Sequence, residues 1–177
     1  MPVPDLITTI GGATSNSYIT LAEASDYFEA RLDGESWFDE SDDRHKQALI
    51  TATRKLNGLN WLGDRVTTTQ VLAWPRIDVP KRDSAGVCTY GWGGYLYSGY
   101  GDYYRSDEIP DLIKEAQAEF AFALLEGFNE GDEDQISGFG ADGMNVQLRL
   151  SRPAGSLPSE VSRLISGLIR GTRLMRA

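Results

Sequence analysis

The chain has 177 residues, of which 41% are hydrophobic and 24% are charged, and its formal net charge is −9, so one globular domain with a sizeable core is expected. No apolar stretch approaches the roughly 18 residues of a membrane span, and no Lys or Arg precedes the first hydrophobic run, so neither a span nor a signal peptide is expected. The single cysteine and single histidine exclude an internal disulfide and a histidine-rich metal site.

The charges are unevenly distributed along the sequence. Residues 152–177 contain five arginines and one acidic residue, which gives this segment a net charge of +4. Residues 1–151 contain the other 12 basic and 25 acidic residues, a net charge of −13. This division predicts two surfaces with different partners, and a solvated basic tail is the alternative. An acidic body is a poor generic nucleic-acid binder, because Lys and Arg supply most of the affinity for phosphates.

Three amphipathic helices are predicted in the first two thirds of the chain. Thr20 and Glu23 have the spacing of a capping box and begin a helix over residues 20–32. Acidic residues in the first turn, followed by apolar residues at helical spacing, predict a second helix over residues 42–57. A proline in the first turn and a long apolar stripe predict a third helix over residues 110–126.

Shorter elements are predicted in the remaining sequence. A helical turn is expected at Thr69–Ala73 and must end before Pro75, because the residue before a proline disfavours the helical conformation. Apolar and polar residues alternate from Val146 to Leu150, which predicts a half-buried strand. After Pro158 a last helix is predicted from four apolar residues on one face, namely Val161, Leu164, Ile165 and Leu168.

These elements predict a mainly α fold, a helical bundle with a small β-hairpin or strand element. Residues 1–151 are expected to form the helical domain, with residues 77–108 as a long aromatic, glycine-rich loop within it. Residues 152–177 are expected to form a basic amphipathic C-terminal helical arm.

The loop contains an unusual aromatic segment. Fifteen residues, 90–104, include five glycines and seven tyrosines and tryptophans, and the aromatic residues are Tyr90, Trp92, Tyr95, Tyr97, Tyr100, Tyr103 and Tyr104. Tyr and Trp offer large contact areas at little cost in rotamer entropy. One interpretation is a loop that contacts another protein or a neighbouring subunit. The alternative is a hairpin whose aromatic residues fold back over the domain's own helices.

The sequence does not indicate an enzyme. His45, the only histidine, lies among charged residues at the start of a predicted helix, and we expect it to be solvated rather than catalytic. Cys88 lies near no motif and is expected to be a small hydrophobic residue. Gly138–Gly143 matches the spacing of a dinucleotide-binding motif, but a strand follows it where that motif needs a helix. No catalytic, metal or cofactor site is predicted.

Four blocks in the first part of the chain resemble a known family. They are Asn16–Ala24 with the following Tyr27, Phe28 and Arg31, then Gln47–Thr53, Gln70–Arg76 and Ile109–Ala116, and the resemblance covers roughly residues 10–126. Their order resembles a phage and prophage family labelled DnaT-like single-stranded-DNA-binding proteins. Such proteins are in turn similar to head–tail adaptors, or head-completion proteins, which form rings beneath the phage portal. The aromatic segment is longer and richer in aromatic residues than the linker of that family.

The resemblance implies a structural virion protein, a head–tail adaptor or connector. Its expected partners are the portal protein, neighbouring subunits of a homo-oligomeric ring (a dodecamer by family expectation), and a tail, nozzle or stopper protein. Packaged double-stranded DNA would pass through the ring without specific binding. The expected location is the head–tail interface of the virion, and the host cytoplasm during assembly. The alternative function is binding of single-stranded DNA.

Two interfaces are predicted for the adaptor. The C-terminal helix is expected to dock into a portal groove, through Val161, Arg163, Leu164, Ile165, Leu168, Ile169, Arg170 and Arg173. The alternative is that this helix packs on its own domain. The seven aromatic residues of the loop are expected to contact a neighbouring subunit or a tail protein.

Charge in the loop argues against the alternative function. A single-stranded-DNA binder needs a basic groove together with aromatic residues that stack on bases. Residues 83–108 contain Arg105 as their only positive charge, against four acidic residues. The charge of this segment therefore favours the adaptor over the DNA-binding function.

Overall fold

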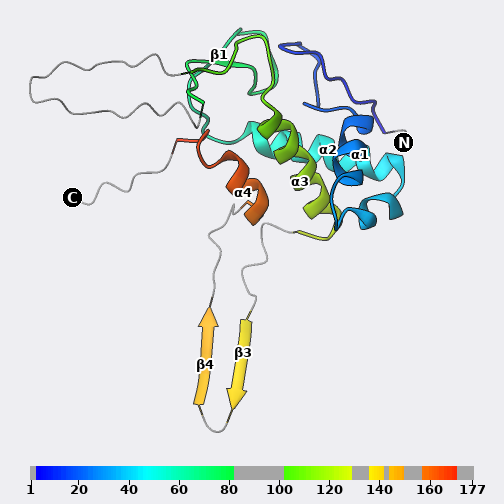
Figure 1. The fold of residues 1–177 in the computed structure, drawn as a ribbon, viewed down its shortest axis with the longest axis vertical. Coiled ribbons are helices and arrows are strands. Elements are labelled where there is room, and N and C mark those ends of the chain that lie inside the picture. Colours follow the sequence, from blue (N-terminus) through cyan, green and yellow to red (C-terminus); the bar gives the residue numbers. More distant parts are fainter. Residues whose placement is uncertain (1–2, 82–101, 129–135, 142–143, 150–156, 171–177) are drawn as a thin grey trace, which may run out of the picture.

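The computed structural model describes residues 3–81, 102–128, 136–141, 144–149 and 157–170 (Figure 1). Within these residues the chain forms four α-helices, one short 3₁₀ helix and two small antiparallel strand pairs. The predicted mainly α fold is therefore confirmed. None of the described helices is long and apolar enough to cross a membrane.

The first helix, α1, comprises Leu21–Glu29 and begins at the predicted capping box. The backbone N–H of Glu23 donates to the Thr20 hydroxyl over 3.2 Å, and the Thr20 N–H donates to the Glu23 carboxylate over 2.8 Å. The helix is shorter than predicted, because the chain then turns into a 3₁₀ helix, η1, at Glu35–Asp39. The sequence pattern did not predict η1.

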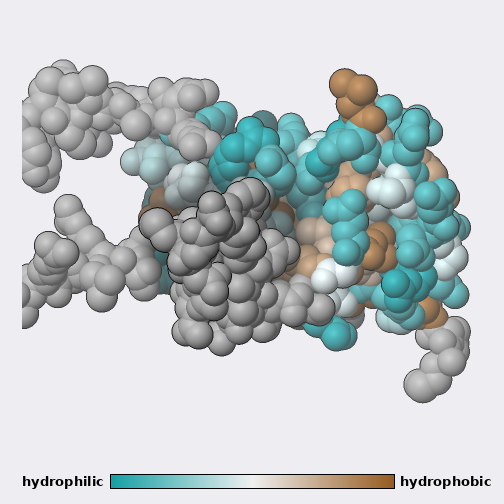
Figure 2. All heavy atoms as spheres, turned by 90° about the horizontal axis from the view of Figure 1, so that it is seen from below, coloured by the Kyte–Doolittle hydropathy of each residue, from teal (hydrophilic) through white to brown (hydrophobic). Residues whose placement is uncertain are grey.

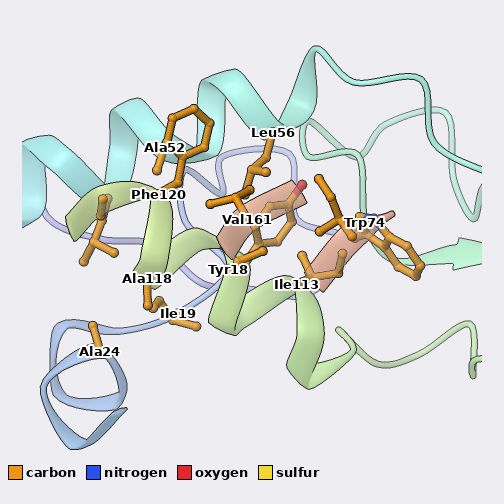
Figure 3. Packing of buried hydrophobic residues seen from close by; sticks show 14 of the residues in the cluster. Tyr18, Ile19, Ala24, Ala52, Leu56, Trp74, Ile113, Ala118, Phe120 and Val161 are labelled. Atoms are coloured by element: carbon orange, nitrogen blue, oxygen red, sulfur yellow. The ribbon is translucent and has the colours of Figure 1, made fainter. Parts of the chain in front are cut away.

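Two long helices form the centre of the fold. Helix α2 comprises Asp42–Asn57, as predicted, and α3 comprises Asp111–Leu125, one residue shorter at each end than predicted. They pack against each other along their length, and the short helix α4, Ser159–Ile165, packs on α3. The surface of the described part is mainly hydrophilic (Figure 2), whereas buried hydrophobic side chains from α1 to α4 form one cluster (Figure 3).

A buried amide side chain ties this cluster together. The Gln117 carbonyl accepts the Tyr18 backbone N–H over 2.8 Å, and the Gln117 amide donates to the Ser17 hydroxyl over 2.7 Å and to the Leu49 carbonyl over 3.2 Å. Gln117 is completely buried on α3. It therefore joins the segment before α1 to both central helices.

A second link is made by Tyr18. Its hydroxyl donates to the Asn57 side-chain oxygen over 2.7 Å, and the same oxygen accepts the Ala73 backbone N–H over 2.7 Å. Burial raises the pKa of the Tyr18 hydroxyl well above its ordinary value. Tyr18 and Ala73, which belong to two of the blocks that resemble the family, thus fix the end of α2 and the loop that follows it.

The segment after α2 is a loop closed by a short β ribbon that the sequence pattern did not predict. Strand β1, Asp64–Arg65, pairs antiparallel with β2, Arg76–Ile77. The predicted helical turn at Thr69–Ala73 is wrong, because the Gln70 amide takes the place of helical hydrogen bonding. It donates to the backbone carbonyls of Leu72 and Pro75, each over 3.0 Å, and its carbonyl accepts the Thr67 N–H over 3.0 Å.

The second strand pair is a hairpin. Strand β3, Ile136–Ala141, pairs antiparallel with β4, Met144–Arg149, and Ala141 lies opposite Met144. The predicted strand from Val146 corresponds to part of β4. The dinucleotide-like glycine spacing begins on β3 and is followed by β4, so the strand predicted after it is present.

Candidate functional site

The apolar face of the C-terminal helix belongs to the domain core. Val161, Ile165 and Leu168 are buried in the same cluster as the residues of α2 and α3. The interpretation of this face as a free docking surface is therefore wrong, and residues 157–170 are part of the helical body rather than a separate arm. The amphipathic spacing marked a buried face, which the sequence could not assign to a partner or to the domain itself.

The remaining residues of the predicted portal interface have different surroundings. Leu164 and Ile169 are partly buried against the core. Arg163 is exposed and forms an ion pair with Glu160 over 2.5 Å, one turn away. Arg170 is exposed, and Arg173 lies outside the described residues.

The aromatic segment is described only at its C-terminal base. Tyr90, Trp92, Tyr95, Tyr97 and Tyr100 lie outside the described residues. The backbone closes this base through hydrogen bonds from Lys81 N–H to the Asp102 carbonyl, over 2.7 Å, and from Tyr104 N–H to the Val79 carbonyl, over 3.0 Å. Tyr104 lies edge-on to Trp74, with ring centroids 6.0 Å apart, whereas Tyr103 is 50% exposed. One tyrosine therefore packs on the core and its neighbour faces solvent.

This difference predicts unequal effects of two adjacent substitutions. Tyr104→Ala should lower the free energy of unfolding by about 1–2 kcal/mol, because it removes a partly buried ring from its contact with Trp74. Tyr103→Ala should change stability by less than about 0.5 kcal/mol. Urea denaturation of both variants beside the wild type checks the prediction. Equal losses would contradict the assignment of Tyr104, and only Tyr104, to the core.

His45 is buried, so the expectation that it is solvated is wrong. Its ring stacks on Trp37 with centroids 4.1 Å apart, and its Nε2 lies 2.6 Å from the Trp37 carbonyl oxygen. η1 places Trp37 over the first turn of α2, and this position covers the imidazole. His45 is therefore packed between α2 and η1, where it contributes to the structure.

Most basic side chains of the described residues are neutralised by acidic partners. Ion pairs are formed by Arg31, Arg44, Lys46, Lys81, Arg105, Lys114 and Arg163. Within the described part of the chain, the exposed Arg54, Arg65 and Arg170 form no ion pair. An arginine without a carboxylate partner retains its hydrogen-bond donors for an external anion.

Two of these arginines lie beside a third at the β ribbon. Arg65 on β1 is directly opposite Arg76 on β2 in the antiparallel register, so both side chains leave the same face of the ribbon. Arg170 is fixed nearby by the hydrogen bond from its backbone N–H to the Asn60 carbonyl, over 2.7 Å, and by the bridge between Trp61 and Ile169. We call Arg65, Arg76 and Arg170 the arginine end.

Arg76 is the structural member of the arginine end. Its guanidinium donates to the backbone carbonyls of Leu62, Gly63 and Ala73, over 2.6, 2.6 and 3.1 Å. Burial, and then the neighbouring charges of Arg65 and Arg170, lower the pKa of Arg76, while Asp64 acts in the opposite direction. Three positive charges therefore lie near one another, and one of them, Arg76, is fixed by hydrogen bonds to backbone carbonyls.

The rest of the molecule carries the opposite charge. Residues 20–43, which form α1, η1 and the start of α2, contain nine acidic residues and one basic residue. Residues 54–81, from the last turn of α2 through the ribbon, contain five basic and two acidic residues. α1 and β1 lie well apart on the helical body (Figure 1). Residues 20–43 thus carry a net charge of −8 away from the ribbon, and residues 102–128 carry a further −5.

Two surface hollows of the described residues are bordered mainly by acidic side chains, and in a third, of about 210 Å³, the one basic residue, Arg44, is paired with Glu40. A hollow of about 240 Å³ is bordered by Asp33, Glu119, Glu126 and Glu160. Another, of about 230 Å³ between α1 and α3, is bordered by Glu23, Asp111 and Glu115. Among the described residues, no group of three or more His, Cys, Asp or Glu side chains could hold a metal ion. The arginine end is therefore the surface with distinct binding chemistry, that of anion recognition.

The sequence pattern did not reveal the arginine end. Its three residues are separated by 11 and 94 positions in the chain, because Arg65 and Arg76 meet through the ribbon and Arg170 returns from beyond α4. The one available signal was the arginine in the Trp74-Pro75-Arg76 block. That block contributes to the resemblance to the family, but the sequence alone indicates no function for its arginine.

Comparison with known proteins gives one match. Residues 6–138 match the model of a family described as "Putative DnaT-like ssDNA binding protein". No curated protein and no solved structure matches the chain. The match covers most of the chain and corresponds to the DnaT-like resemblance, whereas the similarity to head–tail adaptors stays a prediction.

Proposed function

The chain belongs to the DnaT-like family, and from this premise we propose that it binds single-stranded DNA through the arginine end. The observation that carries the proposal is the pair of exposed arginines, Arg65 and Arg170, that lack acidic partners among the described residues and flank Arg76. Guanidinium groups bind phosphates through paired hydrogen bonds, and phosphate contacts supply most of the affinity of a sequence-independent binder.

An exposed aromatic residue pairs with the segment that follows β2. Tyr103 pairs with Pro80, four residues after Arg76, and half of its side chain is exposed. Base stacking on aromatic rings is the second component of single-strand binding, because every base offers a π face. The described part of the chain thus provides both kinds of contact.

The acidic net charge is compatible with this proposal. At an ionic strength of about 0.1 M, charges more than roughly 10 Å apart at the surface are largely screened from each other. The acidic residues of α1 and η1 lie on a different part of the body from the ribbon (Figure 1). A phosphate at the arginine end therefore responds mainly to the local arginines. The scarcity of positive charge in residues 83–108 is offset by arginines that are distant in sequence.

A titration with a fluorescent oligothymidylate tests the proposal. We expect binding at 50 mM salt that weakens steeply by 200 mM salt, with a logarithmic slope of about −0.7 for each phosphate neutralised. A duplex of the same length and label serves as the control, because it lacks the unstacked bases that Tyr103 could contact. Absence of binding to the single strand at 50 mM salt would contradict the proposal.

A second candidate function is the head–tail adaptor, and the acidic residues 20–43 favour it. A surface with eight net negative charges repels the phosphates of double-stranded DNA, as a channel that DNA must pass requires. In this function the protein would bind a portal protein, neighbouring copies and a tail component at the head–tail interface of a virion.

Co-sedimentation with assembled portal protein tests the adaptor function. Truncation before α4 is unsuitable, because it removes buried residues of the core. Arg163→Glu changes an exposed residue of the predicted interface instead. Binding by the wild type, weakened by this substitution, is the expected result. Failure of the wild type to sediment with portal would contradict the adaptor function and leave the DNA-binding proposal unaffected.

A further inference from the structure

The molecule presents two exposed surfaces of opposite charge. We call residues 20–43 the acidic face. All of its acidic side chains except Glu40 are exposed. Six of them form no ion pair within the described residues, namely Asp26, Glu29, Glu35, Asp39, Asp42 and Asp43. The arginine end likewise has two arginines without acidic partners there. Each surface therefore carries charge that the molecule itself leaves uncompensated.

Both surfaces also expose hydrophobic side chains. On the acidic face Leu32 is fully exposed and Phe38 is 49% exposed. At the ribbon, Val66 and Ile77 are 37% and 39% exposed. Hydrophobic residues interrupt the hydrophilic surface at separate places (Figure 2). A single exposed hydrophobic residue is ordinary, but one pair within each charged surface adds apolar area that association can bury.

We propose that the protein self-associates head to tail, with the acidic face of one copy bound to the arginine end of another. Contact between two acidic faces, or between two arginine ends, would place like charges together, whereas this arrangement brings opposite charges together. Because the two surfaces differ, each copy can bind one neighbour at each of them. When these neighbours are two different copies, the contact is heterologous and successive copies extend into a ring or a filament, whereas two copies that made both contacts with each other would stop at a symmetric dimer.

The proposal implies competition at the arginine end. Arg65 and Arg170 would contact carboxylates of a neighbouring copy in the assembly and phosphates in the DNA complex. This consequence, unlike the self-association itself, rests on the proposed DNA-binding function. A single strand that occupies the arginine end displaces the neighbouring copy, and both contacts weaken as salt screens the charges.

Two double variants test the contact. R65E/R170E removes the arginine end and leaves the acidic face intact, and E35K/D39K does the reverse on the exposed surface of η1. Light scattering at 50 mM salt should show wild-type mass rising with concentration above 19.5 kDa, while each variant alone stays at the monomer mass. An equimolar mixture should associate again, because each variant retains the surface that the other lacks and the two reversed surfaces are also opposite in charge.

The mixture tests charge complementarity between the two surfaces, and a wild-type mass beyond two chains excludes a closed symmetric dimer. Self-association is overturned if the wild type remains monomeric, and the head-to-tail arrangement is overturned if the wild type stops at two chains, if either variant associates alone or if the mixture stays monomeric. Thermal unfolding first confirms that both variants are folded. The two proposals are distinguished by E35K/D39K, which should bind oligothymidylate like the wild type, and by oligothymidylate itself, which should dissociate wild-type assemblies.

Discussion

Replacing Gln117 by leucine should lower the free energy of unfolding by about 2–3 kcal/mol. The substitution removes the acceptor of the buried Tyr18 N–H, and an unpaired buried donor costs roughly 1–3 kcal/mol. The Ser17 hydroxyl loses a donor but still donates to the Ile19 carbonyl over 2.6 Å. The Leu49 carbonyl still accepts the Thr53 hydroxyl over 2.9 Å. Most of the loss therefore comes from one backbone group.

Urea denaturation measures this loss. Gln47→Leu on the exposed side of α2 is the matched control and should change stability by less than about 0.5 kcal/mol. If Gln117→Leu is as stable as this control, the hydrogen bonds between α3 and the segment before α1 do not contribute to stability as inferred.

The largest functional effect is expected from charge reversal at the arginine end. R65E/R170E should weaken binding of oligothymidylate at least about 100-fold, because each lost arginine–phosphate contact costs roughly 1.5 kcal/mol and a factor of ten corresponds to about 1.4 kcal/mol. The salt dependence should also become shallower, by about 1.4 in logarithmic slope for two phosphates. Side-chain substitution leaves the backbone hydrogen bond of Arg170 in place. Fluorescence anisotropy over a salt series measures both quantities.

A matched variant separates the surface from the overall charge. R44E/R163E makes the same change in net charge at two exposed arginines that form ion pairs with Glu40 and Glu160. It should reduce affinity by less than tenfold, equivalent to less than about 1.4 kcal/mol. Equal losses in the two double variants would show that the net charge, rather than the arginine end, governs binding.

The charge pattern of the sequence and the folded structure favour different functions. Sequence reasoning favoured the adaptor because the aromatic segment contained little positive charge. The structure brings three arginines together at the ribbon, and of the described residues of that segment Tyr104 packs on Trp74 while Tyr103 is exposed. The family match points in the same direction, toward single-stranded DNA. The scarcity of positive charge therefore applies to residues 83–108 alone, because the fold brings arginines from other segments to one surface.

Local sequence determined the helices of this protein. The capping box at Thr20, the acidic first turn of α2 and the proline before α3 set helix starts through interactions within a few residues, and the structure confirms all three. The apolar spacing after Pro158 also predicted α4, although the helix ends at Ile165 and Leu168 lies beyond it. Such signals are readable because their partners lie within one turn of the chain.

Tertiary structure decided what the faces of these elements contact. The apolar stripe of α4 required α3 beside it before it could be recognised as core, and His45 required the turn that places Trp37 over it. The arginine end required contacts between residues 60 and 170, and the hydrogen bond between Tyr18 and Gln117 joins residues 99 positions apart. Periodicity identifies a buried face without naming its partner, because burial depends on which distant segments the whole chain brings together.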